Sequence, residues 1–387
     1  MESTKSTLEG SEVFVDTLNA CGVSYIFLSP GTGTTRIHEA LSKFKALGQW
    51  APEVVLSLHE SLAMSAAHGY FMVSGKPQVV LVHHGLGVAQ VGGALLNAQR
   101  GRAGVLLCTT SVPADLGSSA KERRVSDLSW FHEQFDQASI ARDYVKWAYE
   151  LRSDDSIRDV LRYALILAGS EPCGPVYISF PQDVLSRTVE EGQWPSAIKE
   201  PMVSAPQADQ KSIDRAASIL TRAAHPLIIT GHSGRRREGV RALVELAETL
   251  GAKVVTSQYT MNIPTLHPLC GGFGPPPRGT VPGECVSNSD AILVVDADVP
   301  YLPSTNNLSP GAKVIHFDID PIKKDLPSWA FPSDLLVHCD SSQAIPLLTA
   351  AIRERSSAND NARYKARYRV NSTISTRECE KSGITWR

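Results

Sequence analysis

The sequence lacks several features that would place it in common classes of protein. No stretch approaches the run of about 18 apolar residues that a membrane span needs. The N-terminus, MESTKSTLEG, has neither an apolar nor an arginine-rich targeting segment. An excess of one charge is missing too, because 38 basic and 40 acidic residues leave a formal net charge of -2. The sequence therefore predicts a cytoplasmic protein whose partners include no membrane and no nucleic acid.

Close pairs of cysteine and two glycine motifs are also missing. The seven cysteines are scattered and odd in number, so they outline neither a zinc site nor a secreted disulfide framework. We interpret them as reduced thiols. The GxGxxG spacing of a dinucleotide fold is not met, and the dipeptide Gly-Asp does not occur at all.

Residues 1–185 alternate between helical and strand patterns. Continuous apolar runs predict buried strands, and apolar residues at helical spacing between them predict covering helices. This alternation indicates an α/β domain with a doubly wound parallel sheet. The expected strands are 25–28, 54–58, 79–82, 105–110 and 176–180. The expected helix faces include Phe14, Leu18 and Cys21, then Ile37, Leu41 and Phe44, then Leu62, Ala66 and Val73, and Ile157, Leu161 and Ala164.

The rest of the chain repeats the pattern after a break. Residues 186–209 are rich in charge and proline and are expected to form a linker. Residues 210–353 predict a second doubly wound α/β domain, with strands at 227–230, 254–257, 292–296 and 314–319. The stretch Gly271–Gly283 is expected to be a long loop. Residues 354–387 turn polar and basic, with no evident apolar face, and are expected to be a tail or a lead-in to a further domain.

Polar and glycine residues follow three strands of the first domain. Ligands of open α/β sheets bind outside the carboxyl ends of the strands, so these loops are candidate sites. They are Ser29-Pro30-Gly31-Thr32-Gly33, His59-Glu60 and His83-His84-Gly85-Leu86-Gly87.

Each loop also has a plain structural interpretation. Glu60 in the first turn of a helix gains from the helix dipole without any function. Gly31 and Gly33 fit a tight turn. A histidine pair at a strand end is often structural, and one neighbouring pair makes no metal site. The residues alone therefore indicate an α/β enzyme with a polar cleft.

Longer motifs carry a resemblance to a known family. The runs IFLSPGTG and LSLHESLAMSAAHGYFMVSGKPQVVLVHHGLGVAQVGGALLNAQRGRAGVLLCTT resemble the pyrimidine-binding domain of thiamine-diphosphate enzymes of the acetolactate synthase and benzoylformate decarboxylase group. GPVYISFPQDV resembles the closing strand of that domain. ELAETLGAKVVTS and AKVIHFDIDP resemble the central domain of the family. The likeness covers about residues 10 to 350.

The resemblance implies roles for single residues. Glu60 is the glutamate that hydrogen-bonds the aminopyrimidine ring of the cofactor and moves the proton that activates it. His83 falls where benzoylformate decarboxylase carries an active-site histidine, and as a histidine near its ordinary pKa it would relay protons. Thr32 falls where that enzyme carries a substrate-binding serine. Cofactor contacts are expected at Pro30, Gly31, Gly85 and Gly87, and a substrate contact at His84, which with Leu86 and Gln90 departs from that loop.

The resemblance also implies a 2-oxo acid substrate and an incomplete cofactor site. Family members hold the diphosphate through Mg²⁺ on a third domain with a Gly-Asp-Gly motif, which this sequence lacks. We therefore expect a decarboxylase or carboligase resembling benzoylformate decarboxylase. It would be a homo-oligomer, or a hetero-oligomer with a chain that carries the diphosphate-binding domain. The alternatives are an acetolactate synthase large subunit, for which residues 230–237 give no decisive flavin (FAD) signal, and a non-catalytic partner subunit.

Overall fold

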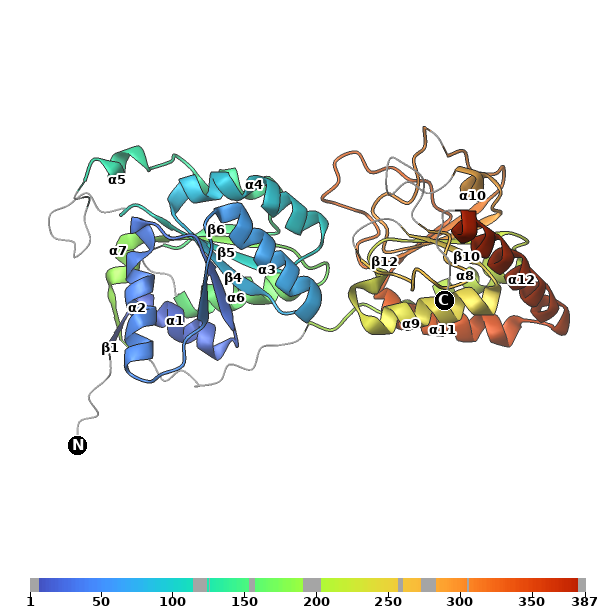
Figure 1. Cartoon of the computed structure of the whole chain (residues 1–387), viewed down its shortest axis with the longest axis horizontal. Coiled ribbons are helices and arrows are strands. Elements are labelled where there is room, and N and C mark those ends of the chain that lie inside the picture. Colours follow the sequence, from blue (N-terminus) through green and yellow to red (C-terminus); the bar gives the residue numbers. More distant parts are fainter. Residues whose placement is uncertain are drawn as a thin grey trace. The chain divides into compact units, whose positions relative to one another are not determined.

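The chain divides into two compact units. The computed structural model describes residues 7–113, 124, 126–152, 157–190, 203–256, 260–272, 283–304 and 306–381. The units are Met1–Val203 and Ser204–Arg387, built around a six-stranded and a five-stranded sheet (Figure 1). Neighbouring strands of both sheets are parallel, and helices flank both sheets. The predicted fold class is thereby confirmed.

The sheet of the first unit has the order β3-β2-β4-β5-β7-β6. The strands are β2 (Tyr25–Leu28), β3 (Glu53–Leu56), β4 (Gln78–Val82), β5 (Val105–Ser111), β6 (Ala148–Glu150) and β7 (Val176–Pro181). Every residue of β4 and β7 is buried, which explains why these strands are mostly apolar. The strand order reverses between β2 and β4, and open sheets bind ligands at such a reversal.

Two sets of helices cover the two faces of this sheet. One face packs against α1 (Gly10–Ala20), α2 (Thr35–Ala46) and α6 (Ile157–Gly169). The other packs against α3 (Glu60–Ser74) and α4 (His84–Arg100). The remaining elements are β1 (Thr7–Glu9) paired antiparallel with β8 (Thr188–Glu190), and the short helices α5 (Leu128–Phe131) and α7 (Gln182–Ser186).

Helix α3 buries a different face from the one predicted. Ala63, Met64 and Ala67 lie in the core, whereas Leu62 and Val73 are 55% and 91% exposed. The expectation for this face was therefore wrong. Small residues on both sides of the helix leave no clear apolar stripe to read. The preceding strand also ends earlier than predicted, at Leu56.

The second unit has the strand order β10-β9-β11-β12-β13. Its elements are β9 (Pro226–Thr230), β10 (Lys253–Thr256), β11 (Ala291–Val295), β12 (Lys313–Asp318), β13 (Leu335–His338), α8 (Gln210–Arg222), α9 (Arg237–Leu250), α10 (Gly283–Ser287), α11 (Ser341–Arg355) and α12 (Ala358–Lys381). Helices α8, α9 and α11 share one core cluster with the sheet. The predicted loop Gly271–Gly283 lies outside the described residues except at its ends.

Helix α12 falls in the stretch that was expected to have no apolar face. Tyr364 is buried in the core of the second unit, and Tyr368 packs against the same cluster. Arg363 and Arg367 lie over the Tyr364 ring at 5.7 and 5.3 Å, so their stems and charges cover the aromatic side chain. That expectation was wrong.

Among the described residues, no helix is long and apolar enough to cross a membrane.

Candidate functional site

The loops after β2 and β4 meet where the strand order reverses. The Ser29 N–H donates to the Leu81 carbonyl at 3.1 Å, and the Gly33 N–H donates to His83 Nδ1 at 3.2 Å. Two of the three predicted loops are thus brought together. The first hydrogen bond joins backbone groups at the ends of β2 and β4, and the second joins the backbone of the first loop to the His83 side chain.

The two glycines of the first loop let the histidine rings approach the backbone. A Cβ atom on Gly31 would lie 2.5 Å from Cβ and Cγ of His83. A Cβ atom on Gly33 would lie 2.4 Å from Cε1 of His84. Real Cβ atoms do not come so close to other heavy atoms, so the packing of these rings requires glycine at both positions.

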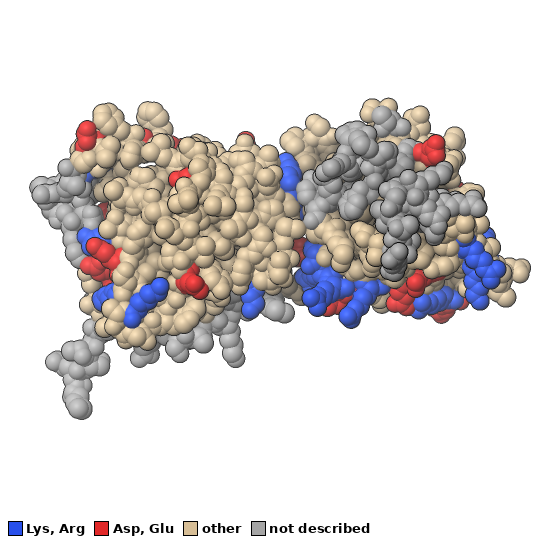
Figure 2. Space-filling view, in the orientation of Figure 1, with Lys and Arg blue, Asp and Glu red and all other residues tan. Residues whose placement is uncertain are grey.

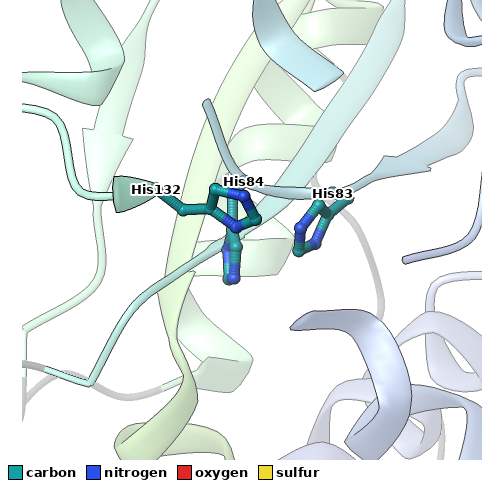
Figure 3. Close-up of side chains that lie close together, drawn as sticks. All are labelled: His83, His84 and His132. Carbon is teal, nitrogen blue, oxygen red and sulfur yellow. The ribbon is translucent and has the colours of Figure 1, made fainter. Parts of the chain in front are cut away.

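A third histidine joins the predicted pair. His132, at the end of α5, lies with its ring 5.3 Å from that of His83 and 6.0 Å from that of His84, and the His83 and His84 rings are 4.1 Å apart (Figure 3). His84 is buried and the other two are half-buried. One ring nitrogen from each lies within 4.8 Å of the others. We call these residues the histidine cluster.

Hydrogen bonds assign the tautomers of two of the rings. His83 Nδ1 accepts the Gly33 N–H, so the proton of a neutral His83 is on Nε2. His84 Nδ1 lies 2.8 Å from the Thr110 carbonyl oxygen, which only accepts, so the proton of His84 is on Nδ1. His83 is therefore a donor through Nε2, and His84 is an acceptor through Nε2.

The cluster disfavours protonation of its members. Burial lowers the pKa of His83 to about 4, with further lowering by His84 and His132. Burial also lowers the pKa of His84, partly opposed by the Thr110 carbonyl. Both rings are neutral at pH 7. The expectation that His83 keeps a pKa near its ordinary value was wrong, because spacing along the chain does not report how far a ring is removed from water.

Two anchors hold the segment that carries His132. Arg124 makes two hydrogen bonds of 2.6 Å to Glu133, and its Nε donates to the Pro113 carbonyl at 3.1 Å. On the other side, the buried Gln137 amide lies 2.9 Å from both Thr109 Oγ1 and Tyr177 Oη. The cluster is therefore supported from both sides. His132 was missed in the sequence because its segment has no periodic pattern that places it near the sheet.

Glu60 stands apart from this cluster at the start of α3. Its side chain is 21% exposed, and its Oε2 lies 4.0 Å from Nδ1 of His59, which caps the helix by accepting the Ser61 N–H. Ser61 Oγ donates to the Gln90 carbonyl at 2.6 Å, which ties the start of α3 to α4. The backbone of Glu60 is therefore held in place, and its carboxylate is partly exposed to solvent.

The other predicted contacts have varied surroundings. Pro30 and Thr32 are exposed, and Thr32 begins a short 3-10 helix. A Cβ atom on Gly87 would lie 2.8 Å from the Val82 side chain, so this glycine permits close packing of α4 on β4. At Gly85 a Cβ atom would meet the Gln134 side chain.

Apolar side chains are exposed on α3 and α4 and on the chain that leads into α3. We call this set the α3–α4 face: Leu56, Leu58, Leu62, Met72, Val73, Leu86 and Leu96. Glu60 and Arg100 are the sole charged residues of the two helices, and Figure 2 shows few charges over this part of the first unit. Both helices therefore expose mainly uncharged surface.

Comparison with known proteins matches each unit to a family model. Residues 8–140 match the N-terminal TPP binding domain of thiamine pyrophosphate enzymes, and residues 213–339 match the central domain of the same enzymes. The first match lies in the first unit and the second match lies in the second unit.

Relatives and solved structures agree with these matches. The chain is 26% identical over 315 residues to an acetolactate synthase of Bacillus subtilis, covering 80% of this chain and 51% of the relative. It is 29% identical over 372 residues to a probable 2-ketoarginine decarboxylase of Pseudomonas aeruginosa, covering 94% and 61%. The chain therefore spans between about half and three fifths of these relatives.

Two solved structures share the fold. A putative thiamin diphosphate-dependent enzyme of Mycobacterium smegmatis has a TM-score of 0.72 and 25% identity, covering 90% of this chain and 63% of that one. Benzoylformate decarboxylase of Polynucleobacter necessarius has a TM-score of 0.73 and 21% identity, covering 91% and 62%. Since both domain models match in order along one chain, this protein belongs to the thiamine pyrophosphate enzyme family.

Proposed function

We propose that this chain supplies the pyrimidine-binding side of a thiamine-diphosphate-dependent 2-oxo acid decarboxylase or carboligase. The observation that carries the proposal is Glu60, a partly exposed carboxylate at a strand end beside an otherwise nearly uncharged surface. A partly exposed carboxylate can exchange a proton with a ring nitrogen of a bound cofactor.

The proposed work of Glu60 is to hold and move one proton. Thiamine diphosphate, when bound, supplies an electron sink for the carbanion left when a 2-oxo acid loses carbon dioxide. Glu60 would hydrogen-bond the aminopyrimidine ring of that cofactor. The Ser61–Gln90 hydrogen bond keeps the start of α3 in place while the proton moves.

The proposed substrate contacts lie around the loop after β2. His83 presents its Nε2 proton, and Thr32 presents an exposed hydroxyl group. Both are donors that suit the carboxylate of a 2-oxo acid. His84, whose Nε2 only accepts, is proposed to contact a donor group of the substrate. Pro30, Gly31, Gly85 and Gly87 remain proposed cofactor contacts.

The diphosphate side of the cofactor is proposed to come from another domain or chain. The sequence has no Gly-Asp-Gly motif, and the described residues include no cluster of carboxylates that would hold Mg²⁺. This chain is thus proposed to bind the pyrimidine half of the cofactor and not its diphosphate half. We propose the α3–α4 face as the surface where the other half docks, in a homo-oligomer or a hetero-oligomer.

An acetolactate synthase-like activity is the second candidate, because several relatives carry that name. At the strand ends of the second unit, several polar groups are already bonded to other protein groups rather than open to a flavin. There the Asn262 side chain bonds the Gly234 N–H at 2.8 Å and the Gly231 carbonyl at 2.9 Å. A Cβ atom on Gly234 would lie 2.1 Å from the Met261 carbonyl oxygen. These contacts tie the loop after β9 to residues 261 and 262.

The test is proton exchange at the thiazolium carbon, followed by NMR. The full chain is combined with a diphosphate-binding domain of a relative, Mg²⁺ and cofactor. Glu60→Gln should slow the exchange about 10²–10⁴-fold. Glu53→Gln, at an exposed glutamate of β3, should leave the rate unchanged. Equal rates in the unmutated chain and Glu60→Gln would refute the role of Glu60. No exchange above the cofactor alone would favour a non-catalytic partner.

A further inference from the structure

The histidine cluster has the composition of a metal site. His83 and His84 follow β4, and His132 comes from a segment some fifty residues later in the chain, yet one nitrogen of each lies within 4.8 Å of the others (Figure 3). No other group of three or more such side chains was found among the described residues. The neighbouring pair visible in the sequence becomes a set of three only in the fold.

The donor atoms select the class of metal. Three neutral imidazole nitrogens suit borderline cations such as Zn²⁺, Co²⁺, Ni²⁺ and Cu²⁺, whereas Mg²⁺ requires oxygen ligands. Zinc–nitrogen bonds of about 2.0–2.1 Å place tetrahedral ligand atoms about 3.4 Å apart. The three rings must therefore close by a small rotation of their side chains. His132 and His83 are half-buried. Because His83 packs closely on Gly31, most of this movement is expected from His132.

Supporting contacts fix one of the ligands. The Thr110 carbonyl accepts from Nδ1 of His84 at 2.8 Å, which directs the lone pair to Nε2. Histidine ligands of metals are oriented in this way by a carbonyl or a carboxylate on the other ring nitrogen. Gly33 packs against the same ring and limits its movement. His84 is therefore held in the correct tautomer before any ion binds.

Metal binding by His83 is less favourable, because His83 must give up a hydrogen bond. Its Nδ1 accepts the Gly33 N–H, so its free nitrogen is protonated. Ligation by His83 requires the loss of this hydrogen bond. Loss of one neutral hydrogen bond weakens binding by about five-fold, which is small beside the affinity of three-histidine sites.

We propose that His83, His84 and His132 bind one borderline divalent transition metal ion and leave a coordination position open. Three protein ligands with an open position are the arrangement of reactive rather than purely structural zinc sites. The bound ion takes His83 and His84 away from the substrate contacts proposed above, so it acts as an inhibitor of the assembled enzyme. Metal binding itself does not rest on the proposed function; the inhibition does.

The test is titration of the full-length chain with Zn²⁺ against a chromogenic chelator, and with Co²⁺ followed by its visible absorption. One equivalent of Zn²⁺ should bind, and millimolar Mg²⁺ should not compete. His132→Ala and His83→Ala should each weaken binding at least ten-fold. His68→Ala, which removes a half-buried histidine of the same unit outside the cluster, should leave it unchanged.

Three results would overturn the proposal. They are the absence of one-equivalent binding, an unchanged affinity in both cluster variants, and an equal loss in the His68 variant. His84 is buried with a left-handed backbone (φ 38°), so its replacement risks misfolding and is not used as the deciding variant. Circular dichroism of each variant checks the fold. Zinc that binds but does not inhibit the assembled enzyme would refute the inhibition, and with it the substrate role of His83.

Discussion

A buried histidine in the second unit should make the fold sensitive to acid. His316 lies on β12 with no exposed surface, its ring edge-on to Trp329 at 5.7 Å. Neither ring nitrogen has a hydrogen-bond partner among the described residues. Burial, with a smaller effect of Lys323, lowers the pKa of His316 to about 4. The folded state therefore favours the neutral ring.

The sign of the effect follows from the two states. In the unfolded chain His316 has an ordinary pKa of about 6.5. The native preference for the neutral ring contributes stability above pH 6.5, and this contribution is lost as pH falls from 6.5 through 4. The gap of about two and a half pH units, at about 1.4 kcal/mol each, gives an upper value of about 3 kcal/mol.

The perturbation is His316→Leu, which replaces the imidazole ring with an apolar side chain of similar size. The variant should be more stable than the unmutated chain, and its advantage should grow by about 2.5 kcal/mol between pH 7.5 and pH 4.5. Removal of unpaired buried nitrogens should also add about 1–3 kcal/mol at any pH. Urea unfolding at a series of pH values, followed by circular dichroism and tryptophan fluorescence, measures both effects.

His338→Leu is the matched control, because His338 is an exposed histidine on the neighbouring strand β13. It should not change the pH dependence. If the free energy of unfolding of His316→Leu falls with acid as steeply as that of the unmutated chain, the argument from burial is wrong.

Four further changes test other parts of the structure. The full chain alone should bind thiamine diphosphate with Mg²⁺ weakly by titration calorimetry, and tight binding would contradict the split cofactor site. Leu62→Lys should abolish self-association or pairing in sedimentation without lowering the melting temperature. Gly33→Ala, whose Cβ would lie 2.4 Å from the His84 ring, should cost about 1–3 kcal/mol in urea unfolding. Tyr364→Ala should destabilise the second unit by about 3–5 kcal/mol in calorimetry.

The sequence predicted best where burial is complete. Strand β2 has the predicted bounds, and β4 and β7 differ by one residue at one end. A strand buried on both faces must be apolar throughout, so its signal is continuous. Helix α3 was harder, because alanine and glycine fit both the core and the surface. Tyr364 and Tyr368 were overlooked because two rings in a charged helix form too narrow a stripe to detect.

Part of the candidate site could also be predicted from the sequence, and part could not. The meeting of the loops at Gly33 and His83 follows from parallel strands that end at one edge, and strand ends are visible in the sequence. The place of His132 depends on the Arg124–Glu133 ion pair and on the hydrogen bonds of Gln137, and neither follows from a periodic sequence pattern. The lowered pKa of His83 depends on burial first and then on His84 and His132, and neither is visible in the spacing of residues along the chain.

Helix α12 determines where the chain can be cut or joined. Its Arg367 and Asn371 side chains donate to the carbonyls of Ala223 and Gly251 at 3.3 and 2.9 Å. A side chain on Gly251 would collide with the Tyr364 carbonyl. A protein shortened after α11 would expose the apolar side chains that pack against Tyr364. The carbonyls of Ala223 and Gly251 would lose these hydrogen bonds. Such a protein should tend to aggregate. An engineered fusion to a third domain should therefore begin after Lys381, because α12 closes the second unit and is not a free linker.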